Sequence, residues 1–135
     1  MSIVISTDKE KLDLNFIHEF LTHSYWASGR TKEEVMISIK NTLAFGVYLD
    51  GKQIGFARIL TDYIIFGYIM DVFIIEEYRG NGYSKLLMNT IMEHSDLNCI
   101  KTWMLATKDA HTLYQKFGFK AIDDPTKLMK KLVTK

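Results

Sequence analysis

The chain has few of the residues that cross-link or interrupt small proteins. Its 135 residues include one cysteine, Cys99, and one proline, so no disulfide can close within the chain, and this usage is typical of a reducing compartment. It has no internal repeat, no Ser- or Gln-rich tract and no long run of like charge, which argues against a solenoid or a disordered linker. Because a chain of this length can bury one core but not two, we expect a single domain over residues 1–135.

Strong charge and long apolar runs are also missing. The net charge is +1 at pH 7, whereas a nucleic-acid-binding domain normally shows a strongly basic face. The first six residues lack the basic start and apolar core of a signal peptide, and the most apolar stretch, residues 64–75, is broken by Gly67 and Asp71. We therefore expect a cytoplasmic protein, a monomer or homodimer, that binds neither nucleic acid nor membrane.

Hydrophobic periodicity and capping signals predict the helices. Asp13 precedes a helix with apolar residues on one face, and Thr31-x-x-Glu34 is a capping box that opens a second helix. Two more helices are expected at residues 82–94 and 109–117. The residues expected to face inward are Leu14, Ile17, Phe20, Leu21, Val35, Met36, Ile39, Ala110, Leu113, Tyr114 and Phe117.

Runs rich in β-forming residues predict the strands. Asp50-Gly51 is a strong hairpin signal between strands expected at residues 43–49 and 53–61. A first strand is expected at residues 3–5, and later ones at 66–75, 100–106, 119–122 and 127–132. The alternation of these strands with the helices predicts an α/β sandwich on a mixed sheet.

A junction between an apolar strand and a helix is the most informative motif. Gly80 and Gly82 stand between the strand and the helix expected from residue 82, so the backbone can adopt positive φ there and lie close to a bulky anion. The first N–H groups of that helix lack intrahelical partners and carry the positive end of its dipole, which suits a phosphate. Neither the G-x-G-x-x-G pattern nor the Walker pattern is present.

Two motifs together identify the chain as resembling the GNAT superfamily of N-acetyltransferases. Residues 79–84, Arg-Gly-Asn-Gly-Tyr-Ser, resemble the family's pyrophosphate loop, Q/R-x-x-G-x-G/A, with Ser84 at the last position. Residues 110–119 resemble the later motif A-x-x-L-Y-x-x-x-G-F. The resemblance covers roughly residues 68–119 and implies a GNAT-like mixed, mainly antiparallel sheet with a splayed central strand pair, flanked by about four helices.

The same resemblance implies acetyl-CoA as co-substrate. The strand before the loop would hold the pantetheine arm and the thioester oxygen by its main chain, the loop would hold the diphosphate, and Thr107 occupies the place of an Asn that contacts pantetheine in relatives. Arg79 and Lys85 bracket the loop and could neutralise phosphate. The expected cofactor-binding residues are Val72, Phe73, Ile74, Arg79, Gly80, Asn81, Gly82, Tyr83, Ser84, Lys85 and Thr107.

Two residues are candidates for catalysis. Tyr114 matches the family's general acid, and a phenol is protonated at neutral pH and can protonate a thiolate; alternatively it is a core tyrosine. No carboxylate occupies position 102, where several relatives place a glutamate. Asp71, which interrupts an apolar strand, is therefore the candidate base or acceptor-binding residue, with a structural aspartate hydrogen-bonded to a neighbouring strand as the alternative.

The acceptor is expected opposite the coenzyme. An aromatic cluster with one arginine would suit a small amine that carries an apolar or carboxylate group; its members are Tyr25, Trp26, Arg30, Tyr63 and Phe66. Alternatively, Trp26 fills the edge of the core. No metal-ligand spacing is recognised. Three functions remain open: N-acetylation of a primary amine on a small molecule, acetylation of a protein lysine or N-terminus, and acetyl-CoA sensing without catalysis.

Overall fold

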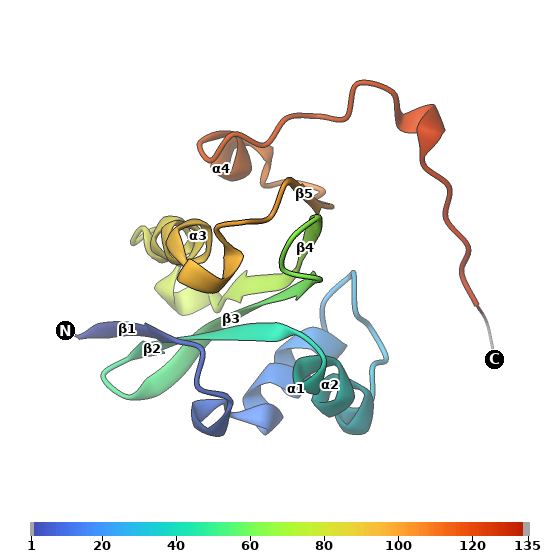
Figure 1. Cartoon of the computed structure of the whole chain (residues 1–135). Coiled ribbons are helices and arrows are strands. Elements are labelled where there is room, and N and C mark those ends of the chain that lie inside the picture. Colours follow the sequence, from blue (N-terminus) through green and yellow to red (C-terminus); the bar gives the residue numbers. More distant parts are fainter. Residues whose placement is uncertain (1, 134–135) are drawn as a thin grey trace.

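A five-stranded sheet forms the centre of the computed structural model, which describes residues 2–133 (Figure 1). The strand order is β1-β2-β3-β4-β5. Neighbours are antiparallel from β1 to β4, whereas β4 and β5 are parallel. The strands are β1 Ile3–Ser6, β2 Leu43–Leu49, β3 Lys52–Thr61, β4 Phe66–Ile74 and β5 Thr102–Leu105.

Helices cover both faces of the sheet. Helices α1 and α2 lie on one face and α3 lies on the other, with α4 beyond β5 (Figure 1). Each face has its own apolar core, because side chains alternate between the faces along a strand. The helices are α1 Leu14–Thr22, α2 Lys32–Lys40, α3 Tyr83–Glu93 and α4 His111–Gln115, with 3-10 turns η1 Lys9–Lys11, η2 Glu76–Tyr78, η3 Ser95–Leu97 and η4 Pro125–Lys127.

The helix caps and the hairpin turn that the sequence predicts are present in the structure. Asp13 caps α1 by accepting a hydrogen bond from the backbone N–H of Phe16, and Thr31 and Glu34 form the reciprocal capping box of α2. At the β2–β3 turn, Asp50 and Gly51 both have positive φ, 49° and 85°, as a type I′ hairpin requires. These signals are local, so they are read correctly without knowledge of the tertiary structure.

Met36 was predicted to face inward and does not. Val35 and Ile39 are buried, but Met36 is 51% exposed. Residues four apart on a helix share a face, whereas the next residue in sequence is rotated by about 100°. Only the face of α2 that includes Val35 and Ile39 packs against the sheet.

Strand β4 carries an extra residue and then leaves its neighbour. Phe56 pairs with Phe73 and Arg58 pairs with Met70, so one residue of β3 lies opposite two of β4. Asp71, one of these two, has φ of 54°, and the arrangement is a β-bulge. Strand β5 pairs with β4 only from Phe66 to Ile69, and beyond Ile69 the two strands diverge. The predicted splayed pair is therefore confirmed.

The two strands predicted after α4 are absent from the described residues. Residues 119–122 and 127–132 belong to no strand, and η4 is the only regular turn between residues 119 and 133. Residues 120–133, here called the C-terminal arm, run away from the body of the molecule (Figure 1). A β-prone sequence forms a strand only when it pairs with the edge of another strand, and within the described residues this arm pairs with none.

Candidate active site

The glycine loop lies between the end of β4 and the start of α3. Gly80 and Gly82 have φ of 82° and 79°, and a Cβ atom at either position would meet nothing within 4 Å. Gly82 is the N-cap of α3 and provides no side-chain hydrogen bond to the helix. The start of α3 thus has open space beside the glycines and no side-chain cap from Gly82 on its first N–H groups, which is the geometry that an anion such as a diphosphate needs.

Side chains around the loop hold its conformation. The Nε of Arg79 donates to the carbonyl of Ile74 at 2.8 Å, and Asn81 donates through Nδ2 to the carbonyl of Tyr78 at 3.0 Å. Tyr83 packs against the core beneath α3, and Lys85 is exposed. The loop is thus fastened to the end of β4, and the charge of Arg79 stays beside it.

A cleft of about 820 Å³ opens where β4 and β5 diverge. This volume is in the range of small-ligand sites. The cleft brings together residues that are far apart in sequence, from the segment before α2, the bulged strand, the glycine loop and α4. Of the residues predicted from the sequence, it is lined by Tyr25, Trp26, Arg30, Asp71, Val72, Phe73, Ile74, Arg79, Ser84, Thr107 and Tyr114.

Tyr114 lies on the wall that α4 contributes. Its side chain is 8% exposed and its ring packs edge-on against Phe119 at a centroid distance of 6.1 Å. Burial raises the pKa of the Tyr114 hydroxyl to about 12, with smaller contributions from Tyr25 and Asp109. The hydroxyl therefore keeps its proton throughout the neutral range, so it can act as a proton donor there and not as a base.

Asp71 is the centre of a buried ion-pair network. Its Oδ2 accepts hydrogen bonds from the guanidinium groups of Arg58, at 2.6 Å, and Arg30, at 2.7 Å. Its Oδ1 accepts from the indole N–H of Trp26 at 3.0 Å. Burial alone would raise the pKa of the Asp71 carboxyl, but the hydrogen bonds and charges of Arg30 and Arg58 outweigh burial and hold that pKa below its usual range.

These contacts match the structural alternative for Asp71 better than a free base. A general base must be within reach of the substrate proton and have a pKa near the working pH, whereas both oxygens of Asp71 accept bonds from protein donors. A catalytic role for Asp71 stays a prediction. Its observed contacts fix Trp26 and Arg30, the acceptor-binding candidates from the segment before α2.

Arg58 was missed in the sequence, although a signal for it was present. It interrupts the apolar run of β3 as Asp71 interrupts that of β4, and its side chain is 8% exposed. Hairpin pairing places Arg58 opposite Met70, next to Asp71. Opposite charges at neighbouring positions of two paired apolar strands could therefore have been recognised as a buried pair.

The structure does not bring Tyr63 and Phe66 into the cleft. Both lie at the β3–β4 hairpin, 44% and 37% exposed, and neither lines the cleft. Phe66 stacks instead on Tyr68. The structure therefore places Tyr63 and Phe66 outside the cleft, although Tyr68, the stacking partner of Phe66, lines it. Phe20 and Lys108, which were not predicted, line the cleft instead.

Thr107 lines the cleft just before α4. Its hydroxyl accepts a hydrogen bond from the backbone N–H of Ala110 at 3.0 Å, so it holds the turn into α4. Next to it, the ammonium of Lys108 lies 5.4 Å from the centre of the Tyr25 ring. This contact connects the β5–α4 loop with the segment before α2 across the cleft.

Among residues 2–133, no group of three or more His, Cys, Asp or Glu side chains is arranged to hold a metal ion. No helix in the same range combines the length and the apolar character needed to cross a bilayer.

The chain is similar to known acetyltransferases in sequence. The model of the acetyltransferase (GNAT) domain matches residues 40–121. A Gibberella zeae protein named as an acetyltransferase is 24% identical over 139 aligned positions, which span 84% of this chain and 76% of that protein.

Solved structures share the fold. A Xanthomonas campestris pv. campestris protein assigned to the GNAT family is 41% identical, with a TM-score of 0.94 over 98% of this chain and 94% of its own. A Clostridium acetobutylicum acetyltransferase, crystallised with acetyl-CoA, is 15% identical, with a TM-score of 0.71 over 98% and 96% of the two chains. On the family match and on the likeness to the Xanthomonas protein, this chain belongs to the GNAT acetyltransferase family.

Proposed function

We propose that this protein is an N-acetyltransferase that moves the acetyl group of acetyl-CoA directly to a primary amine of a small-molecule acceptor. One observation carries the proposal. A single cleft joins the anion-binding loop before α3, the buried Tyr114 hydroxyl and the pocket around Trp26 and Arg30. These are a coenzyme site, a proton donor and an acceptor site, the parts that acetyl transfer requires.

The residues of the loop fit acetyl-CoA. The open space beside Gly80 and Gly82 and the N-terminus of α3 suit its diphosphate, and Arg79 adds positive charge. The Clostridium acetobutylicum relative holds acetyl-CoA on the same fold, which supports this assignment. Bound there, the coenzyme would supply an acyl thioester.

The bulge in β4 suits the reacting end of the thioester. Beyond Ile69 the side of β4 that faces β5 has no strand partner. The carbonyl of Ile74 accepts from Arg79, and the other main-chain groups on this side between Val72 and Ile74 are available to a ligand in the cleft. Fixed backbone N–H groups polarise a carbonyl without reorganising. Tyr114 lies on the opposite wall and can donate its proton to a departing thiolate.

The acceptor end favours a small amine with an anionic or apolar group. The cationic side chains that line the cleft are Arg30, Arg79, Lys108 and Lys130, whereas its carboxylates are Asp71 and Asp109. Because Asp71 is already paired with two arginines, the acceptor end is not an acidic groove. A lysine-rich peptide needs such a groove.

Within this proposal Asp71 acts through its neighbours. It holds the indole of Trp26 and the guanidinium of Arg30 at the acceptor pocket, and Arg30 has further N–H donors besides the one that binds Asp71. The neutral form of the amine is then selected from solution or formed by proton transfer to water in the cleft, without a dedicated carboxylate base.

A screen of acetyl-CoA consumption tests the proposal. The panel contains amino acids and other amines that carry a carboxylate, polyamines, aminoglycosides and lysine peptides. We expect turnover that is fastest with the small amines that carry a carboxylate. Turnover of lysine peptides alone would instead support a protein acceptor, and acetyl-CoA binding without turnover of any amine would support a sensor.

A further inference from the structure

The buried network around Asp71 has an excess of positive charge. Arg58 and Arg30 both donate to the same carboxylate oxygen, and the indole N–H of Trp26 donates to the other oxygen. Within residues 2–133, the ion pairs of these two guanidinium groups are both with Asp71. A buried charge without a counter-charge is costly, so an anionic ligand beside the network would supply what it lacks.

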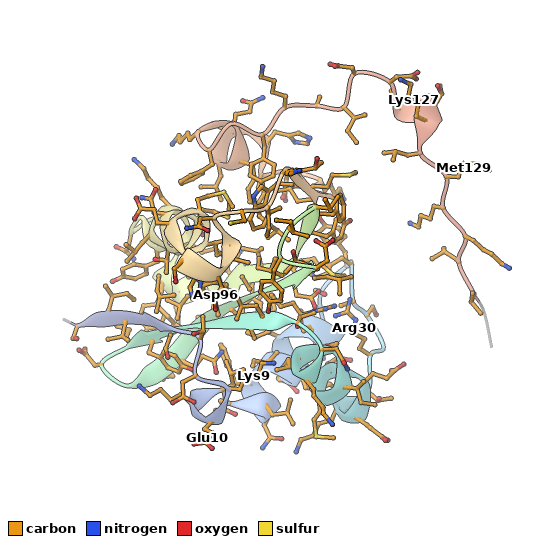
Figure 2. The ribbon with its side chains drawn as sticks, viewed as in Figure 1. Lys9, Glu10, Arg30, Asp96, Lys127 and Met129 are labelled. Atoms are coloured by element: carbon orange, nitrogen blue, oxygen red, sulfur yellow. The ribbon has the colours of Figure 1, made fainter. Side chains whose placement is uncertain are left out.

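Arg30 brings this excess charge to the cleft. It comes from the segment between α1 and α2 and points toward the sheet (Figure 2). Its side chain is 25% exposed, whereas that of Arg58 is 8% exposed, and Arg30 lines the cleft while Arg58 does not. One N–H group of Arg30 is bound to Asp71, and the planar guanidinium has further donors whose geometry matches a carboxylate.

The other cationic side chains that line the cleft suit an acceptor anion less well. Arg79 donates through Nε to the carbonyl of Ile74 beside the glycine loop, so it belongs to the coenzyme end. The ammonium of Lys108 is exposed and lies over the Tyr25 ring, and Lys130 is exposed. Arg30 is therefore the cation that a buried network holds in place at the acceptor end.

Aromatic side chains form one wall of the acceptor end. Phe20 stacks on Phe73 at a centroid distance of 3.8 Å and packs against Trp26 at 6.3 Å. Tyr25 packs edge-on against Trp26 at 5.1 Å. All four rings line the cleft, and those of Trp26 and Tyr25 leave much of their surface exposed. Such a wall can cover an aromatic or other large apolar group of a ligand.

The anion site lies close to the bulge in β4. The guanidinium of Arg30 is 2.7 Å from the carboxylate of Asp71, and only the short aspartate side chain separates that carboxylate from the bulged main chain. An amine that attacks a thioester held by residues 72–74 is thus close to the group that Arg30 binds. In an α-amino acid the amine, the carboxylate and the side chain share one carbon, which matches this spacing.

We propose that the acceptor is a free α-amino acid with an aromatic or other large apolar side chain. Its carboxylate binds the remaining N–H groups of Arg30, its side chain packs against the wall of Phe20, Tyr25 and Trp26, and its amine points to the bulge. This inference rests on the proposed function and narrows it, from amines with either group to molecules that have both groups on one carbon.

The transfer then yields an N-acetyl amino acid and free coenzyme A. The lone pair of the neutral amine forms a bond to the acetyl carbon, and the carbon–sulfur bond breaks with its electron pair on sulfur. The hydroxyl of Tyr114 protonates the thiolate and regains a proton from solvent, while the nitrogen loses a proton to water. The carboxylate on Arg30 stays unchanged throughout, so it serves binding and orientation only.

Matched acceptors test the proposal with the full-length protein. Phenylalanine has both groups, phenethylamine lacks the carboxylate, and alanine lacks the ring. With saturating acetyl-CoA, kcat/KM for phenylalanine should exceed that for phenethylamine by about 10²-fold, the scale of a charged hydrogen bond, and that for alanine by at least about 10-fold. Turnover of phenethylamine as fast as phenylalanine would overturn the inference and leave the proposed function standing.

A substitution at Arg30 tests whether this residue binds the carboxylate. Arg30→Gln should lower kcat/KM for phenylalanine by about 10-fold or more and change that for phenethylamine far less, because only phenylalanine has the group in question. Asp71 keeps Arg58 as a partner, so unfolding should stay cooperative. Lys108→Gln, which removes another cation of the cleft, should preserve the discrimination. Equal losses with both acceptors in Arg30→Gln would show a structural role and overturn the assignment.

The aromatic wall has its own test. Tyr25→Ala removes a ring that is 63% exposed and should lower the preference for phenylalanine over alanine, while the preference for phenylalanine over phenethylamine persists. An unchanged ratio of phenylalanine to alanine would overturn the placement of the side chain on this wall.

Binding without chemistry separates this inference from the proposed function. Calorimetry of phenylalanine added to the protein saturated with coenzyme A should show binding that Arg30→Gln weakens by about 10-fold or more. Such binding without turnover of any amine would support the site and overturn the proposed function. Neither binding nor turnover of phenylalanine would overturn the inference, and turnover of other amines would then still support the proposed function.

Discussion

Arg58 and Asp71 form an ion pair of 2.6 Å between neighbouring strands, with both side chains almost completely buried. The pair spans the β-bulge, and Arg30 joins it at 2.7 Å from the segment before α2. The carboxylate therefore fastens the segment before α2 to the bulge that shapes the cleft. Asp71, the candidate base, thus also has a structural role that joins β3, β4 and this segment.

Asp71→Asn should weaken both the fold and acceptor binding. The change leaves two arginines close together without their counter-charge, and breaking a buried pair in this way costs about 3–5 kcal/mol. Urea unfolding should show a loss of this order, and the KM for the acceptor should rise more than the KM for acetyl-CoA. Asp96→Asn, at an exposed carboxylate, is the control and should change neither. A fall in kcat with both KM values and stability unchanged would restore Asp71 as the base.

The acid side of the stability curve should report the same group. The pKa of Asp71 is lowered on folding, so its contribution is complete above the ordinary aspartate value of about 4 and is lost as the pH falls through the lower folded-state value. The difference in unfolding free energy between wild type and Asp71→Asn should be constant at neutral pH and shrink in this acid window. Chemical denaturation at a series of pH values measures it, and a constant difference down to the lowest pH would contradict the shift.

Gly82→Val should abolish stabilisation by acetyl-CoA. The branched side chain would enter the open space at the start of α3, where the diphosphate is expected. Gly51→Val is a matched control, because both glycines have positive φ and no atom within 4 Å of an added Cβ, so each change costs about 1–2 kcal/mol of backbone strain. Thermal unfolding with and without the coenzyme should show a ligand-induced shift only in the control. An equal shift in both variants would place the coenzyme elsewhere.

Tyr114→Phe should lower the rate of acetyl transfer by roughly 10²-fold, the scale of one general acid, with coenzyme binding retained. The ring and its contact with Phe119 remain, and only the proton donor is lost. An acyl donor with a more acidic thiol needs less protonation and should recover part of the rate. Turnover of both donors by both proteins measures this, and equal deficits for the two donors would argue against the general-acid role.

Unfolding at alkaline pH provides a second test of Tyr114, because it depends on the pKa of its hydroxyl. Folding raises its pKa from about 10 to about 12, so the protonated hydroxyl contributes stability that is complete below pH of about 10 and is lost as the pH rises toward the folded-state value. A shift of this size corresponds to about 3 kcal/mol. Denaturation of the wild type in this window should lose more stability than that of Tyr114→Phe, and parallel curves would contradict the shift.

Local signals in the sequence predicted most of the fold, and two residues of the predicted glycine loop, Arg79 and Ser84, line the cleft. The caps at Asp13 and Thr31 and the Asp50-Gly51 turn depend on neighbours within a few residues. The arm after Phe119 was misread as two strands because β-propensity does not say whether an edge is within reach. Arg58 was missed because its structural role depends on its ion pair with Asp71, which lies in another strand.

Two of the candidate acceptor residues lie outside the cleft for a geometric reason. Tyr63 and Phe66 are close to the bulge in sequence, but an extended strand advances about 3.3 Å per residue, and neither residue lines the cleft. Trp26 and Arg30 reach the cleft from a distant part of the chain through contacts with Asp71, and Tyr25 packs edge-on against Trp26. Where a sheet brings together the residues of a site, closeness in sequence is a poor guide to which side chains meet there.

The separation of β4 and β5 after Ile69 affects which substitutions the cleft can tolerate. The cleft exists because two backbones part, and the bulge that parts them is held by a buried pair rather than by the side chains that a ligand touches. Residues on the lining, such as Tyr25 or Lys108, can therefore be exchanged without closing the space. Substitution there would alter which acceptor fits while the scaffold stays the same, so new specificities are accessible by single steps.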